Sequence, residues 1–248
     1  MERKNAWEKY SEEDRKKVFD FAEEYRGFIS RCKTERECVT ALRTLAEKAG
    51  FMDMEDVIAK GIRLKPGDRV LAENKGKSMA MYVIGQKSVE AGMNILGAHI
   101  DSPRLDLKQN PLYEDADLAL LDTHYYGGVK KYQWVTLPLA LHGVVAKKDG
   151  TVVEINVGEK PGDPVFGVSD LLIHLSQEQL KKSAASVIDG EDMNILIGSM
   201  PMSVTDEDDQ ETKQAKQKIC GNILNILKEQ YGIEEEDFLS AELEVVPA

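Results

Sequence analysis

The residues Met93-Asn94-Ile95-Leu96-Gly97-Ala98-His99-Ile100 form a short, nearly continuous apolar run. Such a run is typical of a strand that is buried on both faces, as in the centre of an α/β sheet. The next residues, Asp101-Ser102-Pro103, predict a loop, because proline has no N–H for the ladder of a central strand. We therefore expect a central strand over 93–100 that ends in a polar loop.

His99 and Asp101 stand at the end of this expected strand. Residues two apart in a strand point to the same side, and open α/β sheets bind ligands at their carboxyl edge. A metal-bound histidine usually donates its other N–H to a carboxylate, which Asp101 would provide. The alternative is a partly buried histidine that caps a strand, and the spacing alone favours this alternative, because H-x-D is a common pattern.

Upstream of this run, the chain predicts two helices and a hairpin. Apolar residues recur at three- and four-residue steps over 18–29, which indicates an amphipathic helix. Thr34 and Glu37 have capping-box spacing and begin a second helix. Gly50 ends that helix, because glycine adopts the left-handed conformation at low cost. The residues 69–84 then predict a hairpin.

Downstream, the sequence becomes rich in β-forming residues. Strands are expected at 118–126, 135–146, 151–157 and 193–200. A helix is expected over 206–231, where the acidic residues 206–209 suit the positive end of the helix dipole. Apolar and polar residues alternate from 239 to 245, which predicts a half-buried strand.

The other three histidines are weaker candidates for chemistry. His124 lies in a polar strand and is expected at the surface. His142 is expected to be a hydrogen-bonded core or turn residue. His174 interrupts the apolar stretch Leu171–Leu175, and the sequence alone favours an interface or core position for it over metal binding.

Composition and charge limit the class of protein. The 248 residues are 42% hydrophobic and 31% charged, as in an ordinary globular protein, so disorder is not expected. Thirty-two basic and 44 acidic residues give a formal net charge of −12. This charge argues against nucleic acids and anionic membranes as partners, because both are polyanions. No apolar run approaches the roughly 20 residues of a membrane span.

The cysteines and the motifs that the sequence lacks limit the kinds of site that the protein could carry. The three cysteines, Cys32, Cys38 and Cys220, indicate neither a disulfide framework nor a cysteine zinc site. Reduced thiols in a cytoplasmic protein fit best, and the charged N-terminus shows no signal peptide. The sequence lacks the Gly-x-Ser-x-Gly elbow, the P-loop, the strand-linked G-x-G-x-x-G and His-Glu-x-x-His, so nothing supports the sites that they mark.

The stretch 94–108, which contains His-Ile-Asp-Ser-Pro-Arg-Leu-Asp-Leu-Lys, closely resembles the signature of the aspartyl aminopeptidase-like family of dinuclear zinc aminopeptidases. Three later stretches resemble further blocks of that family, in the same order: 125–128, 134–139 and 241–248. The resemblance covers essentially the whole chain. The length of the first matching string makes it specific, whereas H-x-D alone would not be.

This resemblance implies an α/β fold in three parts. Residues 1–108 would form the N-terminal part of the catalytic domain, with part of its sheet and helices. Residues 109–236 would form an inserted β-rich dimerisation (lid) domain, and 237–248 a strand that returns to the catalytic domain. Members of the family remove N-terminal residues from peptides. They assemble dodecamers from dimers, so peptide substrates and a homo-oligomer formed through the lid domain are expected.

The resemblance also implies roles for three residues. The histidine that matches His99 is a ligand of one of two zinc ions, and the aspartate that matches Asp101 supports it. His174 falls where the lid domain of a neighbouring subunit contributes a histidine to the active site. Cobalt or manganese would also suit the oxygen and nitrogen ligands that the resemblance implies.

The family's other metal ligands follow the point where this sequence ends. A two-metal hydrolase needs both ions to polarise the carbonyl and to generate hydroxide, and one histidine does not supply the usual zinc ligand set. We therefore expect a zinc metallo-aminopeptidase at the level of the complete protein, with this chain inactive alone. The alternative is a non-catalytic assembly or regulatory subunit that docks through the lid domain.

Overall fold

The computed structural model describes residues 4–205, 210–212 and 218–248 of a mixed α/β protein. The chain divides into two compact units, Met1–Ser102 and Pro103–Ala248, and each unit is described by itself. The acidic stretch 206–209, expected at the start of a helix, lies outside the described residues.

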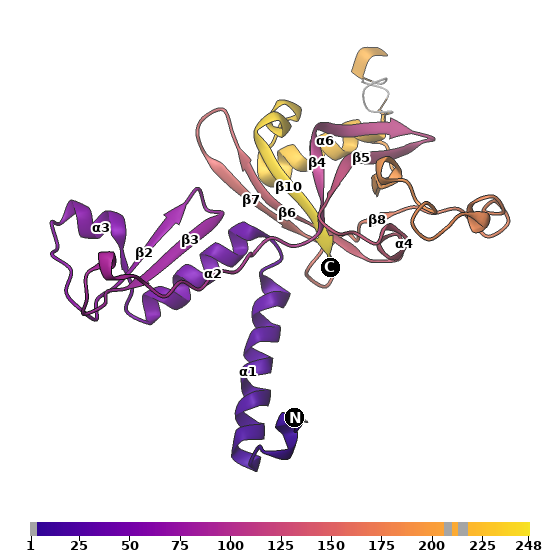
Figure 1. Cartoon of the computed structure of the whole chain (residues 1–248). Helices are drawn as coiled ribbons and strands as arrows, with labels where there is room; N and C mark the ends of the chain where they lie inside the picture. The colour runs from indigo at the N-terminus through magenta and orange to yellow at the C-terminus, as the bar shows by residue number, and fades with distance from the viewer. Residues whose placement is uncertain (1–3, 206–209, 213–217) are drawn as a thin grey trace. The chain divides into compact units, whose positions relative to one another are not determined.

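The first unit contains helices and one small sheet (Figure 1). Its helices are α1 (Glu12–Arg31), α2 (Glu35–Lys48) and α3 (Met54–Ala59), with short 3-10 turns at η1 (Ala6–Glu8) and η2 (Val89–Ala91). The strands are β1 (Met52–Asp53), β2 (Arg69–Asn74) and β3 (Ser78–Val83). They lie in the order β1-β2-β3, with β1 parallel to β2 and β2 antiparallel to β3, so the expected hairpin is confirmed.

Local signals set the ends of the two long helices. The Ser11 side chain accepts a hydrogen bond from the backbone N–H of Asp14, and both halves of a capping box are present at the start of α1. Thr34 and Glu37 form the second capping box, which confirms the prediction for α2. Gly50 follows α2 with φ of +82°, the left-handed conformation that was expected of it.

The expected central strand over 93–100 is wrong. These residues form a loop between η2 and β4 (Figure 1), and Ile95 and Leu96 are 79% and 100% exposed. A strand requires a neighbouring strand to donate and accept its backbone hydrogen bonds. Within the described ranges no strand pairs with 93–100, so the apolar run alone does not produce a strand here.

The second unit is built on a seven-stranded sheet in the order β7-β6-β10-β4-β5-β9-β8. All six neighbouring pairs are antiparallel. The strands are β4 (Arg104–Asp115), β5 (Leu118–Tyr126), β6 (Leu139–Ala146), β7 (Val152–Val157), β8 (Gly167–Val168), β9 (Ile195–Gly198) and β10 (Ala241–Pro247). The helical segments are α4 (Lys131–Trp134), α6 (Ile219–Tyr231), η3 (Gln179–Lys181), η4 (Gly190–Asp192) and η5 (Glu235–Ser240).

The β-rich segments predicted from the sequence correspond to β5, β6, β7 and β9, with shorter bounds for the last three, whereas β4 was not predicted. The strand expected over 135–146 begins at Leu139, because the residues before it continue the turn that follows α4. The strand expected at the tail is β10, and it lies between β6 and β4 inside the sheet of the second unit. Within the described part of the helix expected over 206–231, residues 210–212 and α6 (Ile219–Tyr231) are helical.

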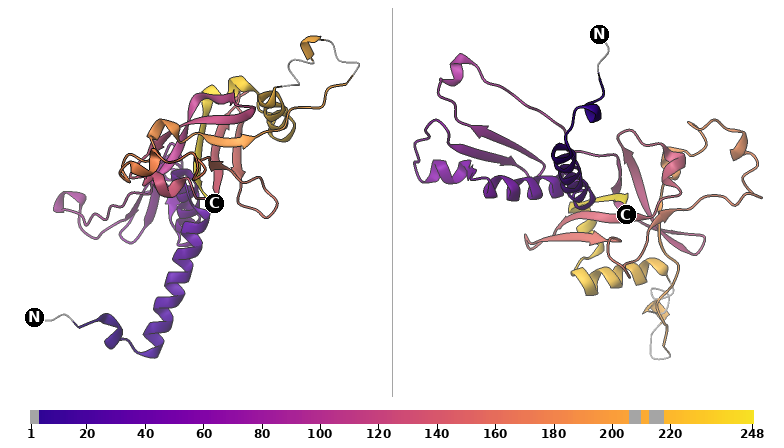
Figure 2. Two further views of the ribbon diagram at one scale, coloured as in Figure 1. Left: turned by 90° about the vertical axis from the view of Figure 1, so that its right-hand side faces the viewer. Right: turned by 90° about the horizontal axis from the view of Figure 1, so that it is seen from below.

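One face of the seven-stranded sheet carries the apolar core, and α6 packs there (Figure 2). Leu243 and Val245 of β10 are buried in this core, and Leu224 and Leu227 of α6 pack against it. Glu244 alternates with these residues on β10 and so points to the opposite face, yet it is only 3% exposed. The tail strand is therefore buried at Glu244 as well, and not half-buried as expected.

Gly143 allows β6 and β10 to approach closely at the middle of the sheet. It pairs with Leu243 of β10 and has φ of +140°, which disfavours residues with a Cβ atom. A Cβ atom on this residue would lie 2.0 Å from the backbone oxygen of Glu242. Only glycine fits this position without a shift of one strand.

Candidate metal-binding site

The structure brings His99 and Asp101 together in the loop that follows residues 93–98. The His99 Nδ1 atom lies 3.0 Å from the backbone oxygen of Asp101 and 3.1 Å from its Oδ1 atom. The His99 side chain is 84% exposed, and that of Asp101 is 37% exposed. The pairing expected from the i, i+2 spacing is therefore present, although the backbone is a loop and not a strand.

These contacts select one form of the His99 ring. Both partners of Nδ1 are oxygen acceptors, so Nδ1 carries the proton and donates it to them. In the neutral imidazole the lone pair then belongs to Nε2. Metal-bound histidines commonly use this arrangement, with one ring nitrogen held by a carboxylate or carbonyl and the other directed at the ion. The contacts with Asp101 thus involve Nδ1 and leave Nε2 outside the pairing.

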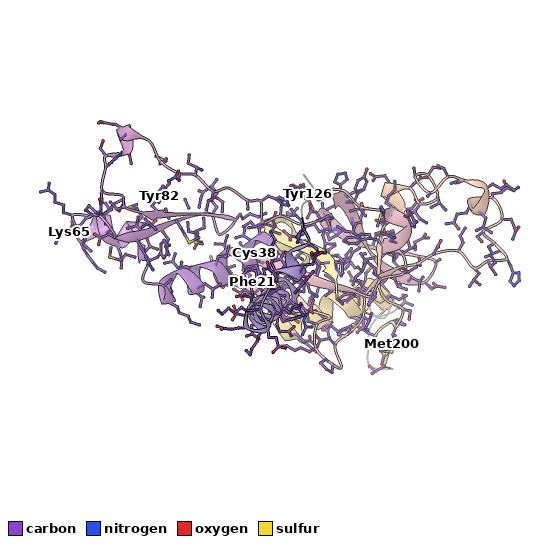
Figure 3. The ribbon with its side chains drawn as sticks, turned by 60° about the horizontal axis from the view of Figure 1, so that its bottom comes forward. Phe21, Cys38, Lys65, Tyr82, Tyr126 and Met200 are labelled. Carbon is purple, nitrogen blue, oxygen red and sulfur yellow. The ribbon has the colours of Figure 1, made fainter. Side chains whose placement is uncertain are left out.

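Cys38 of α2, labelled in Figure 3, contacts the backbone of Ile100 in the same loop. Its Sγ atom lies 3.9 Å from the backbone oxygen of Ile100 and 3.7 Å from that of Cys32. Burial, together with the neighbouring Cys32 thiol, raises the pKa of Cys38 to about 11. The group therefore remains a thiol at neutral pH, able to donate weakly to either carbonyl.

The described residues do not complete a zinc site around His99. Among them, no group of three or more histidine, cysteine, aspartate or glutamate side chains is placed to hold a metal ion. Structural zinc takes four protein ligands, and catalytic zinc usually takes three with a water. In the described part of the chain, His99 and Asp101 could therefore supply one ligand and its orienting partner, but not a complete set of metal ligands.

His174 lies in the second unit, on an exposed turn. Leu172, Ile173, His174 and Leu175 are all exposed, whereas Ser176 beside them is buried. The turn is held by hydrogen bonds to the backbone oxygens of Leu172 and Ile173. A core position for His174 is therefore wrong, and an interface position stays a prediction.

The remaining histidines behave as predicted. His124 is exposed on β5. His142 is 1% exposed, and its Nε2 atom lies 2.9 Å from Oε1 of Glu159, so the expectation of a hydrogen-bonded core residue is confirmed.

A buried charge cluster at the start of β4 was not predicted from the sequence. The Nε atom of Arg104 lies 2.7 Å from Oδ1 of Asp106 and 3.6 Å from Oε1 of Glu244, and its guanidinium lies over the Tyr126 ring at 4.2 Å. Arg104 and Glu244 are both nearly inaccessible to solvent. The only sequence signal is their opposite charge, because the β4–β10 pairing that joins them is visible only in the structure.

Comparisons with known proteins identify the family of this chain. Residues 28–248 match the model of the family described as Aminopeptidase I zinc metalloprotease (M18). The chain is 61% identical over 247 residues to the Probable M18 family aminopeptidase 1 of Clostridium acetobutylicum, covering all of this chain and 51% of the relative. The crystal structure of the Clostridium acetobutylicum aminopeptidase I has a TM-score of 0.86 at 56% identity, covering 100% of this chain and 53% of that one. An M18 aminopeptidase structure from Thermotoga maritima has a TM-score of 0.86 at 42% identity, covering 100% and 51%.

The fold and the family match thus place the chain in a family of zinc metalloproteases. More narrowly, the chain belongs to the M18 family of aminopeptidases. It spans about half the length of the curated relatives that it matches. In the described ranges, no helix is long and apolar enough to cross a membrane.

Proposed function

We propose that this chain supplies part of the active site of a cytoplasmic dinuclear zinc aminopeptidase, which removes N-terminal residues from peptides. In this proposal His99 binds one zinc ion through Nε2, and Asp101 orients the ring. The other ligands come from the half of the M18 protein that this chain does not match. The chain alone is therefore inactive. Its two units correspond to part of the catalytic domain and to the lid domain.

One observation carries the proposal. The contacts of His99 Nδ1 with the backbone oxygen and the carboxylate of Asp101 fix the ring with Nε2 available for a metal. A histidine that merely caps a strand has no need of such an arrangement, and residues 93–100 form no strand here. The 84% exposure of the His99 side chain leaves room for ligands from elsewhere.

Replacing His99 tests the metal role. We expect no peptidase activity from residues 1–248 alone, and zinc-dependent release of N-terminal residues once the unmatched half of the Clostridium acetobutylicum relative is added as a second polypeptide. In that mixture His99→Ala should lower kcat/KM by more than about 100-fold, because loss of an orienting partner alone typically costs about 10–100-fold. Zinc content, measured by atomic absorption, should fall together with activity.

His124→Ala is the matched control, because His124 is also an exposed histidine, and its described contacts are a stacked ring of Tyr125 and the charge of Glu191. Its activity should equal that of the unaltered mixture. Turnover by residues 1–248 alone with bound zinc would contradict the placing of the other ligands outside this chain. Full activity of His99→Ala would remove His99 from the metal site.

His174 is proposed to act in the active site of a neighbouring copy. Its support is the exposed turn, where the apolar side chains of Leu172, Ile173 and Leu175 surround the imidazole without covering it. An apolar, exposed segment of this kind is typical of a contact between subunits. Self-association through the second unit would bring His174 to another subunit.

For His174→Ala in the same mixture, we expect kcat to fall about 100-fold while the assembly measured by analytical ultracentrifugation stays unchanged. The basis is that one lost hydrogen-bond donor at a transition state costs about 100–1,000-fold. Unchanged kcat with intact assembly would show that His174 has no part in catalysis.

The same exposed turn favours one second candidate function, a non-catalytic subunit that docks onto complete M18 subunits through its second unit. The two candidates differ in one result. An assembly subunit would join complete M18 subunits and leave their activity independent of His99, whereas the enzyme proposal requires His99.

A further inference from the structure

The connection between β7 and β8, residues 158–166, leads from one edge of the seven-stranded sheet to the other (Figure 1). β8 consists of Gly167 and Val168, and both residues pair with β9. Two residue pairs provide few ladder hydrogen bonds, and each bond has only a modest net strength in water. The exposed turn 171–175, which carries His174 and is called the His174 turn below, follows β8. The position of this turn therefore depends on how firmly the connection holds β8.

His142 of β6 contacts the first part of this connection. Its Nε2 atom lies 2.9 Å from Oε1 of Glu159, and the two side chains are 1% and 24% exposed. An ionised carboxylate only accepts hydrogen bonds, so Nε2 carries the proton and donates it. Ala140 and Val144, which lie on the same side of β6, are apolar. A polar side chain buried beside them is costly unless it is hydrogen-bonded, so the contact with Glu159 stabilises this arrangement.

The rest of the connection is held by backbone hydrogen bonds. The Asp163 carboxylate accepts hydrogen bonds from the backbone N–H of Lys160 at 3.0 Å and of Gly158 at 3.1 Å, and these bonds lower the pKa of Asp163. Phe166 forms two backbone hydrogen bonds with Leu139 of β6, of 2.9 and 3.2 Å. The connection is thus closed on itself in the middle and joined to β6 near both of its ends.

We propose that the pair of His142 and Glu159 positions the His174 turn for its action in the active site of a neighbouring copy. Both are positioning residues, because they act on the turn through the connection and β8. Without the pair, the start of the connection is released, and β8 keeps its place through the bridge at Phe166 and two residue pairs. The His174 turn then occupies a wider range of positions. The inference rests on the proposed role of His174 in catalysis.

Glu159→Ala tests the pair without emptying the core, because the Glu159 side chain is partly exposed. In the full 248-residue chain, deuterium exchange of the amides 166–168 should become about 10-fold faster, since a hydrogen bond to a charged group is lost. Glu159→Gln should restore slow exchange, because the amide oxygen still accepts the bond from His142. Glu154→Ala is the matched control, because Glu154 is an exposed glutamate of β7, and its removal should leave the exchange unchanged.

The effect on catalysis is measured with the same variants in the mixture with the unmatched half of the Clostridium acetobutylicum relative. Glu159→Ala should lower kcat about 10-fold, because a small misplacement of a catalytic group is costly, while KM, zinc content and assembly stay unchanged. In a His174→Ala background, Glu159→Ala should lower kcat no further, because its effect passes through His174. A general loss of structure would instead lower kcat by the same factor in both backgrounds.

Unchanged exchange at 166–168 in Glu159→Ala, or equal losses of kcat with and without His174, would overturn the inference. So would a Glu159→Gln variant that behaves as Glu159→Ala does. The failure of the proposed role of His174 gives a different result. If His174→Ala keeps full activity, that role is wrong and the inference falls with it. If His174→Ala is impaired and Glu159→Ala is not, the inference alone is wrong.

Discussion

Replacing Gly143 by alanine is expected to destabilise the second unit strongly. Two penalties apply at this position. Alanine at a positive φ costs about 1–2 kcal/mol, and the added Cβ atom would lie 2.0 Å from the backbone oxygen of Glu242, where overpacking typically costs a further 1–3 kcal/mol or more. The contact is with backbone, so no side-chain rotation relieves it, and β6 and β10 must separate. Domains are typically stable by only about 5–15 kcal/mol.

Urea unfolding of the full chain measures this effect, with the buried Trp134 of α4 as the fluorescent reporter in a Trp7→Phe background. Gly150→Ala is the control, because Gly150 also has a positive φ, +86°, but no atom lies within 4 Å of its Cβ position. It should show the conformational penalty alone. Equal midpoints for Gly143→Ala and Gly150→Ala would mean that the close approach of β6 and β10 is not a constraint.

The second large effect is expected at Arg104. Arg104→Ala should lower the free energy of unfolding of the second unit by about 3–5 kcal/mol, the usual result of removing one partner of a buried ion pair. The guanidinium lies 3.6 Å from the buried carboxylate of Glu244. Its removal leaves that charge in a poorly solvated place, and the contact with the Tyr126 ring is lost as well.

A double-mutant cycle separates the charge effect from lost packing. Arg104→Leu with Glu244→Leu should be less destabilising than the two single changes added together, because the double change removes both charges of the pair at once. The same tryptophan-reported urea unfolding gives the four free energies. Strict additivity would show that Arg104 and Glu244 do not interact energetically.

Elements whose signals are local could be predicted from the sequence. The capping residues of α2, the glycine after it, and the hairpin of β2 and β3 depend on residues close together in the chain, and all were confirmed. The pairing of His99 with Asp101 is local in the same way. Residues 93–100 failed because a central strand depends on partners elsewhere, and composition alone does not provide them.

Contacts between strands that are distant in the chain could not be predicted from the sequence. The alternation of residues in the tail predicts that Glu244 faces solvent. In the structure its neighbours are instead set by β4 and β6, which lie on either side of β10. The cluster around Arg104 and the partner of His142 depend on this arrangement and on the loop that carries Glu159. Strand order is a property of the whole unit, so no single stretch of residues encodes it.

The position of β10 between β6 and β4 has a consequence for the protein as it is synthesised. The hairpins β4–β5 and β6–β7 leave the ribosome first, and the strand that joins them, Ala241–Pro247, is translated about 90 residues after Val157. At about 5–20 residues per second, roughly 5–20 seconds pass with the inner edges of both hairpins unpaired. Open strand edges are sites of aggregation, so the nascent chain is expected to need chaperone protection during this interval.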